Sequence, residues 1–167
     1  MTKIILSLLI VLASTFSHAT GNWTINEDNW VYVNGNAVHG HNFGFVKDKG
    51  KKCDVNLLFI SWSTYSSGIE KFEGENVKVF MEFDGELTYA ILELITTYNF
   101  ADTMTLAMFG NVVMPEEFLD IIRSSKHLVV AFSTKNDMTN TLDIQSDTFD
   151  IEGFADKFEE AQSNCKR

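Results

Sequence analysis

The run of residues 76–91 restricts the fold more than any other part of this chain. Apolar residues recur at every second position of its first half: Val77, Val79, Met81 and Phe83. Side chains that alternate in this way point to opposite faces of a β-strand. Asp84-Gly85 follows at once, and this dipeptide tolerates the positive φ angles that a two-residue hairpin turn requires. The segment therefore predicts an antiparallel hairpin, and with it a β-sheet.

The remaining patterns predict further strands and two short helices. Apolar runs bounded by turn residues predict strands at 29–33, 37–46, 55–62, 103–109, 127–133 and 142–151. Asn34-Gly35 predicts a tight turn between the first two. Residues 87–98 fit a helix face as well as a strand, and the preceding turn favours the strand. Pro115, followed by two glutamates, predicts a helix that ends near Ser125. We expect a mainly β domain, an antiparallel sandwich or barrel with two short helices packed on it.

The C-terminal segment 154–165 predicts an amphipathic helix with a cysteine on its apolar face. At about 100° per residue, four side chains fall within one narrow stripe. They are Phe154, Phe158, Ala161 and Cys165. Charged residues occupy the opposite side, as expected for a face in contact with solvent. We therefore expect this helix to pack on the body of the domain, with Cys165 turned toward it.

Residues 1–19 have the three-part layout of a secretory signal peptide. Lys3 precedes an apolar run of about ten residues, well short of the roughly 20 that a membrane-spanning helix needs. Small residues lie at the positions that signal peptidase reads, so we expect cleavage between Ala19 and Thr20. An N-terminal helix of the folded domain is the alternative. The predicted mature chain, 20–167, is one exported domain with no membrane span, either periplasmic or secreted.

An exported chain meets an oxidising compartment, where its two cysteines, Cys53 and Cys165, are more often paired than free. Only one intramolecular pairing exists, so we predict a Cys53–Cys165 disulfide that tethers the C-terminal helix. Two buried thiols or an intermolecular bridge are the alternatives.

The chain is acidic, with a formal net charge of −10. Removal of the predicted signal peptide takes away one of the 13 basic residues and none of the 23 acidic ones, which leaves −11. Such a surface repels nucleic acid phosphates and anionic lipid, so we expect no nucleic-acid partner. The basic, glycine-containing run 47–52 predicts a loop, and we expect most of the aromatic residues to face the core.

Two groups of residues offer ligands that a metal could use. His39 and His41 would lie on one face of the second predicted strand, but only His127 could add a third imidazole in the mature chain. Oxygen ligands cluster later in the chain: Asn136, Asp137, Asn140, Asp143, Asp147 and Asp150. Calcium loops need a glycine at a fixed position, which is missing here. We interpret this cluster as a solvated loop and strand face and predict no metal site, leaving open whether His39 and His41 bind one.

The sequence carries no motif that indicates catalysis. It has no Gly-x-Ser-x-Gly elbow, no His-Glu-x-x-His and no phosphate-binding glycine loop. The predicted disulfide occupies both thiols, and acid pairs such as Glu82 and Asp84 arise by chance on so acidic a surface. We predict a non-enzymatic protein without a cofactor. Asn22 begins a glycosylation sequon, which matters only in a cell that glycosylates.

The ends of the chain resemble a known family. Trp30 lies early, Cys53 opens a strand, and the segment 149–154 leads into a short helix that ends at Cys165. This layout is similar to that of the invasion-associated locus B family of bacterial envelope proteins. The resemblance implies a Gram-negative periplasmic or surface protein with a non-enzymatic role, although family members often carry additional cysteines.

Three functional hypotheses follow. The first is an exported interaction protein that binds another envelope or extracellular protein through an exposed strand edge or loop face. The second is a carrier of a small apolar ligand in a β-barrel cavity. The third is an envelope hydrolase whose nucleophile and base are brought together only by the fold.

Overall fold

The computed structural model describes residues 21–47, 50, 53–100, 103–133 and 137–166. The predicted signal peptide, with Ala19 and Thr20 at its cleavage point, lies outside these residues. The described part contains nine strands: β1 (Thr24–Ile25), β2 (Trp30–Asn34), β3 (Asn42–Lys47), β4 (Asn56–Thr64), β5 (Asn76–Phe83), β6 (Glu86–Phe100), β7 (Met104–Val113), β8 (His127–Phe132) and β9 (Ser146–Asp150). It also contains two α-helices, α1 (Glu116–Ser124) and α2 (Phe154–Cys165).

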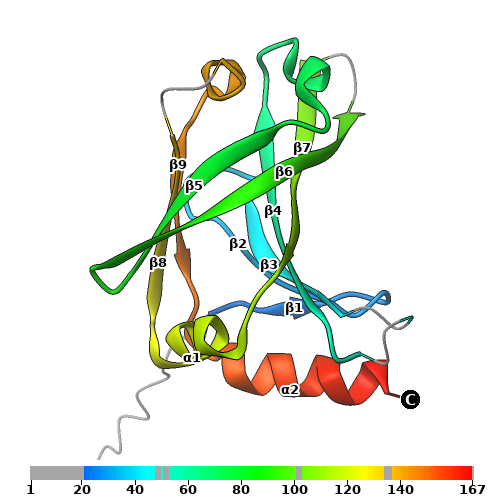
Figure 1. Ribbon diagram of the computed structural model, residues 1–167, viewed down its shortest axis with the longest axis vertical. Coiled ribbons are helices and arrows are strands. Elements are labelled where there is room, and N and C mark those ends of the chain that lie inside the picture. Colours follow the sequence, from blue (N-terminus) through cyan, green and yellow to red (C-terminus); the bar gives the residue numbers. More distant parts are fainter. Residues whose placement is uncertain (1–20, 48–49, 51–52, 101–102, 134–136, 167) are drawn as a thin grey trace, which may run out of the picture.

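All nine strands belong to one antiparallel sheet in the order β1-β2-β3-β4-β7-β6-β5-β8-β9. The sheet curves so that β5, β6 and β8 lie opposite β2, β3 and β4 (Figure 1). The two ends, β1 and β9, are not paired with each other in the described chain, so the sheet stays open and sandwich-like. This confirms the predicted mainly β antiparallel fold with two short helices.

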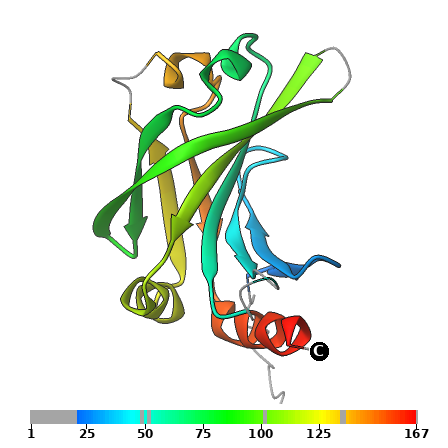
Figure 2. The same cartoon turned by 45° about the vertical axis from the view of Figure 1, so that its right-hand side comes forward.

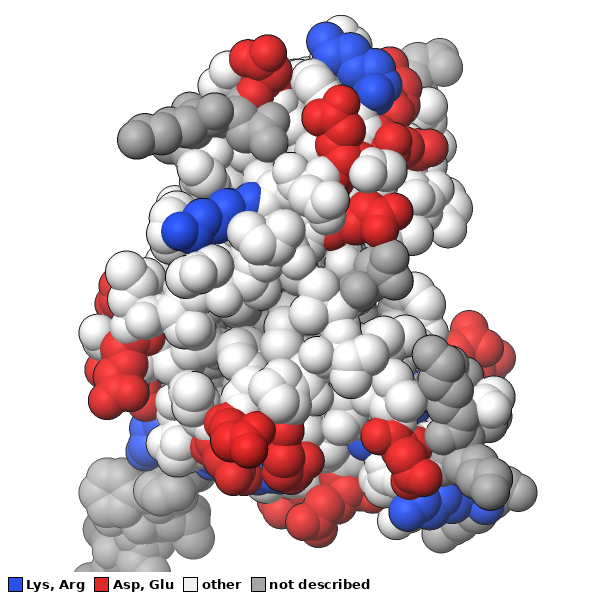
Figure 3. All heavy atoms as spheres, in the orientation of Figure 1, with Lys and Arg blue, Asp and Glu red and all other residues white. Residues whose placement is uncertain are grey.

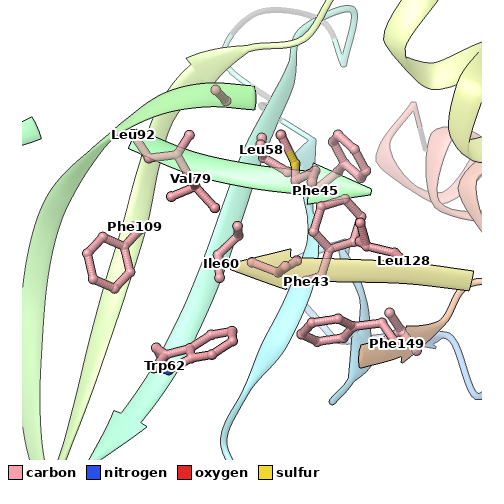
Figure 4. Close-up of a cluster of buried hydrophobic side chains, with 14 of the residues drawn as sticks. Phe43, Phe45, Leu58, Ile60, Trp62, Val79, Leu92, Phe109, Leu128 and Phe149 are labelled. Carbon is pink, nitrogen blue, oxygen red and sulfur yellow. The ribbon is translucent and has the colours of Figure 1, made fainter. Parts of the chain in front are cut away.

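The core lies between the two halves of the curved sheet (Figure 4). The residues of 76–83 that were expected to face inward are all buried, which confirms the alternation of that strand. Aromatic rings fill the space between the halves. Phe43 packs against Phe149 with 6.2 Å between ring centroids, and Phe109 packs against Phe132 at 4.8 Å. Burial of these rings together with the aliphatic side chains around them is the main stabilising contribution to the fold.

The predicted hairpin is confirmed, and its turn also organises a distant segment. Asp84 and Gly85 both have positive φ angles, 47° and 96°. The Asp84 carboxylate accepts hydrogen bonds from the backbone N–H groups of Lys126 and His127 at 2.9 and 3.0 Å. The bond from Lys126 is the main reason why the pKa of Asp84 lies below its usual range. The turn therefore also fixes the start of β8.

The two helices lie together at one end of the sandwich (Figures 1 and 2). In α2 the four predicted stripe residues, Phe154, Phe158, Ala161 and Cys165, are all buried. Cys165 forms the predicted disulfide with Cys53, with 5.9 Å between their Cα atoms. The C-terminal helix is thus tethered to the segment that precedes β4. Neither described helix is long and apolar enough to cross a membrane.

Three element boundaries differ from the sequence-based expectations. No tight turn forms at Asn34-Gly35, because residues 35–41 make a longer connection whose backbone N–H groups bond to β9. β7 continues through Gly110 to Val113, although the glycine predicted its end. The last strand starts only at Ser146, because Asp143 and Ile144 instead accept hydrogen bonds from the Thr64 and Trp62 side chains of β4.

Candidate functional site

A β-bulge in β6 turns apolar side chains toward the outer face of the sheet. The register between β6 and β7 shifts between Leu94 and Thr96. A one-residue shift reverses which positions face outward. Before the bulge odd-numbered residues such as Ile91 are exposed, and after it even-numbered residues such as Tyr98 and Phe100 are. The outer face of β6 is therefore apolar along nearly its whole length.

These side chains form one wall of an open groove of about 590 Å³. The groove runs over β6, β7, β4 and the edge of β3, and β2 contributes one end. Its lining is almost entirely apolar: Trp30, Val46, Leu57, Leu58, Phe59, Ile95, Thr96, Tyr98, Phe100, Leu106 and Met108. We call it the outer groove. A cavity of this volume falls in the range of ligand-binding sites.

Aromatic residues on the outer face support the floor of the outer groove. Phe59 points outward yet is only 5% exposed, because Trp30 and Tyr32 cover it with ring centroids 4.9 and 6.5 Å away. Gly44 makes this packing possible, since a Cβ atom there would lie 2.7 Å from the Cβ of Tyr32. The expectation that the aromatic residues face the core is therefore wrong for this group.

The outer groove continues into a second, more polar hollow of about 400 Å³. Four residues line both: Trp30, Phe59, Leu106 and Met108. The second hollow adds polar side chains from the chain around β2 and β3, including Asn34, His39 and Asn42. Together the two hollows make an elongated site that is strongly apolar at one end and mixed, polar and apolar, at the other.

A buried histidine–aspartate pair holds the loop beside this polar hollow. His41 Nδ1 lies 2.9 Å from Asp147 Oδ2, and both side chains are fully buried. The imidazole stacks on Trp62 with 3.7 Å between ring centroids. Asp147 also accepts hydrogen bonds from the backbone N–H groups of Ala37 and Val38. It therefore fastens the β2–β3 connection to β9, and the interpretation of Asp147 as solvated is wrong.

The structure separates His39 and His41, the two histidines considered above as metal ligands. His39 is exposed in a turn, whereas His41 is buried against Asp147, and β3 begins only at Asn42. They do not lie on one strand face, because the connection that holds them is irregular. Within the described residues, no group of three or more His, Cys, Asp or Glu side chains is arranged to hold a metal ion.

Ser63, His41 and Asp147 are near one another but are not arranged as a catalytic triad. His41 Nε2 lies 3.3 Å from the backbone carbonyl oxygen of Ser63. The Ser63 hydroxyl instead donates to the carbonyl of His39 at 2.9 Å. A nucleophile must bond to its base and reach substrate. This trio is buried, and Ser63 joins it only through its backbone carbonyl, so it ties the β2–β3 connection to β4 and β9.

Lys47 lies in a polar cleft of about 460 Å³ between β3 and α2. Its ammonium group donates to Asn56 Oδ1 and Gln162 Oε1, both at 2.5 Å, and lies 3.7 Å from the centroid of the Phe158 ring. Lys47 is only 3% exposed, so the expectation that it begins a loop is wrong. Burial is the main cause that lowers its pKa from 10.5 to about 8, against the attraction of Glu116.

The other ionisable side chains of this cleft do not form a catalytic pair with Lys47. Glu116 instead pairs with Arg123 at 2.5 Å, and Gln162 and Asn56 are amides. In the part of the chain that the structure describes, no carboxylate lies within ion-pair distance of the Lys47 ammonium group. The cleft therefore holds the Lys47 amine largely away from water, at the place where β3 meets α2.

The lowered pKa of Lys47 predicts that the protein becomes more stable in mild alkali. Between pH values of about 8 and 10.5, the unfolded chain binds a proton that the folded chain has released, so stability rises with pH. From about pH 7 to about pH 9.5 the gain should be about 2 kcal/mol. Urea denaturation of the wild type and Lys47→Met at both pH values measures it as the difference between the two proteins. An equal pH response in both would contradict the prediction.

Comparisons with known proteins identify no relative of this chain. No family model matches the chain, and no curated protein or solved structure matches it significantly.

Proposed function

We propose that this protein is an exported, non-enzymatic binding protein whose outer groove takes an extended segment of a partner protein. The observation that carries the proposal is the elongated site itself, a strongly apolar hollow that continues into one where polar and aromatic side chains are mixed. An extended peptide can present apolar side chains at one end and polar side chains at the other, so it can fill both hollows. A single small apolar molecule would match only the first hollow fully, because the second also presents the polar side chains of Asn34, His39 and Asn42.

The shape of the sheet supports the groove as the binding surface more than a strand edge. Asn36 N–H donates to the Thr148 carbonyl at 2.9 Å, and the Asn36 side chain bonds to the Thr148 hydroxyl. The β2–β3 connection thus covers the outer edge of β9. At the other end of the sheet, β1 is only two residues long. Covered and short edges limit strand addition by a partner.

The predicted compartment and the family resemblance point in the same direction. A disulfide between Cys53 and Cys165 suits an oxidising compartment. The resemblance to the invasion-associated locus B family would place the protein in a Gram-negative periplasm or on the cell surface. We propose another envelope or extracellular protein as the partner, and the −11 charge of the predicted mature chain favours a basic one.

Tyr98→Ser is expected to weaken peptide binding about tenfold. Tyr98 is 54% exposed in the unbound protein and lines the apolar hollow, so a bound segment would cover its ring. The test selects peptides from a random displayed library on the wild-type protein and measures their affinity for both proteins by fluorescence polarisation. We expect the selected peptides to combine an apolar block with a polar or basic one.

Tyr65→Ser is the matched control, since Tyr65 is an exposed tyrosine, 68% exposed, that lies outside both hollows. It should leave peptide affinity unchanged. Equal binding by wild type and Tyr98→Ser would rule out the groove as the peptide site. If no peptide is selected but a fluorescent fatty acid binds the wild type and not Tyr98→Ser, the carrier of a small apolar ligand is the correct function.

A further inference from the structure

A second apolar surface lies on the outer face of the sheet where the first half of β6 pairs with β5, next to the part of β6 that lines the outer groove. It is centred on the cross-strand pair Phe80 and Tyr89, where β5 meets β6. Leu87 and Tyr89 are 68% and 58% exposed, which is unusual for large apolar side chains in the middle of a sheet. Figure 3 shows a mostly uncharged area on this face, where β5 and β6 cross the front of Figure 1, with basic atoms at its upper left and acidic side chains above it, below it and at its left edge.

The residues around this centre form a pattern that is complementary to itself. On β5, Lys78 lies two residues before Phe80 and Glu82 two residues after it. On β6, Ile91 lies beside Lys78 and Leu87 beside Glu82. Consider two such faces in contact, related by a two-fold axis that lies in the plane of the contact and is perpendicular to β5. This axis would stack Phe80 of one copy on Phe80 of the other. It would also bring each Lys78 opposite the Glu82 of the other copy.

We propose that two copies of this protein dimerise through the outer face of β5 and β6, around Phe80 and Tyr89. The contact is isologous, as in most homodimers, because the same patch meets itself. Charge complementarity specifies how the two copies are oriented. If the two β5 strands ran parallel, Lys78 would meet Lys78 and Glu82 would meet Glu82. With the strands antiparallel, Lys78 meets Glu82. Lys78 now lies over the rings of Phe80 and Tyr89, at 4.9 and 3.9 Å from their centroids, within reach of the contact.

The size of the patch sets the strength of the dimer. It comprises a few exposed side chains on two strands, so it is smaller than a standard stable interface, which buries roughly 800 Å² per partner. The acidic charge of each copy also opposes association. We therefore expect a weak dimer that dissociates in the micromolar range.

Charge exchange tests the register directly. Lys78→Glu places two acids opposite each other in each half of the contact, and Glu82→Lys places two lysines there. Sedimentation velocity up to high-micromolar protein should show the wild type dimerising and each variant alone remaining monomeric. An equimolar mixture of the two variants should form a heterodimer, because each contact then pairs opposite charges. The chain that carries both substitutions should form a homodimer again.

The outcomes separate this proposal from a general effect of charge and from the proposed function. Glu82→Lys makes the chain less acidic, so dimerisation that increases in this variant alone would overturn the proposal. A mixture of the variants that stays monomeric would overturn it as well, as would a wild type that is monomeric throughout. Tyr98→Ser, which lies outside the patch, should dimerise like the wild type whether or not it binds peptide.

Discussion

Cys165→Ser is expected to lower the free energy of unfolding by about 4 to 5 kcal/mol under non-reducing conditions, because the disulfide closes a loop of more than a hundred residues. The loss arises mainly in the unfolded chain, whose ends become free to move apart. In the folded protein, Phe154 and Phe158 still pack on Phe45 and hold α2 in place. Urea denaturation followed by tryptophan fluorescence measures the loss as a lower midpoint.

Reduction provides the internal control for this prediction. Dithiothreitol should lower the midpoint of the wild type to that of Cys165→Ser and leave the variant unchanged. Ser163→Ala, an exposed change on the same helix, should alter stability by no more than about 0.5 kcal/mol. Coinciding unfolding curves for the oxidised wild type and Cys165→Ser would show that the bridge contributes no stability.

The parts of the fold that the sequence predicts well depend on interactions between residues close together in the chain. The hairpin at Asp84-Gly85 follows from local φ angles and from alternation over eight residues. The bounds of α2 and its buried stripe follow from helical periodicity, and its cysteine has one available partner. Local geometry determines each of these features, so a single sequence is sufficient to predict them.

The candidate site depends instead on cross-strand register, which local patterns do not determine. The register of β6 on β7 shifts at Ile95, next to Gly110, where a Cβ atom would lie 2.9 Å from both Ile95 Cδ1 and the Leu58 carbonyl oxygen. From sequence, Gly110 predicts only the end of a strand. One available signal was the strand 55–62, where apolar residues occupy both faces. A sheet face that carries Leu57 and Phe59 is apolar, so it indicates that other side chains or a ligand cover it.

Buried polar residues were missed for a related reason. Lys47 belongs to a basic run and Asp147 to an acidic one, and both patterns are typical of solvent-exposed segments. Their burial depends on partners more than a hundred residues away: Gln162 for Lys47, and His41 for Asp147. Such pairings require knowledge of which strands and helices meet, which the sequence of one chain does not contain.

The other large effect is expected for Asp147→Ala, which should lower the free energy of unfolding by about 4 kcal/mol. The carboxylate accepts hydrogen bonds from His41, Ala37 and Val38, so its removal leaves the fully buried imidazole unpaired and detaches the less buried N–H groups of Ala37 and Val38 from β9. Each unsatisfied buried donor costs about 1 to 3 kcal/mol, partly recovered when the loop relaxes. The midpoint of urea denaturation measures the loss, and Asp137→Ala, at an exposed aspartate in the preceding loop, serves as the control.

A double-mutant cycle with His41 distinguishes the broken pair from a general disturbance of β9. His41→Ala removes the imidazole that Asp147 bonds and the ring that stacks on Trp62, so it should also destabilise strongly. If the pair acts as a unit, the double variant should lose about 1 to 2 kcal/mol less than the two single losses combined. Strictly additive losses would mean that Asp147 acts only through the Ala37 and Val38 N–H groups. In that case the hydrogen bonds from the Ala37 and Val38 N–H groups to the Asp147 carboxylate would hold the β2–β3 connection, and the hollow that it lines, without a contribution from His41.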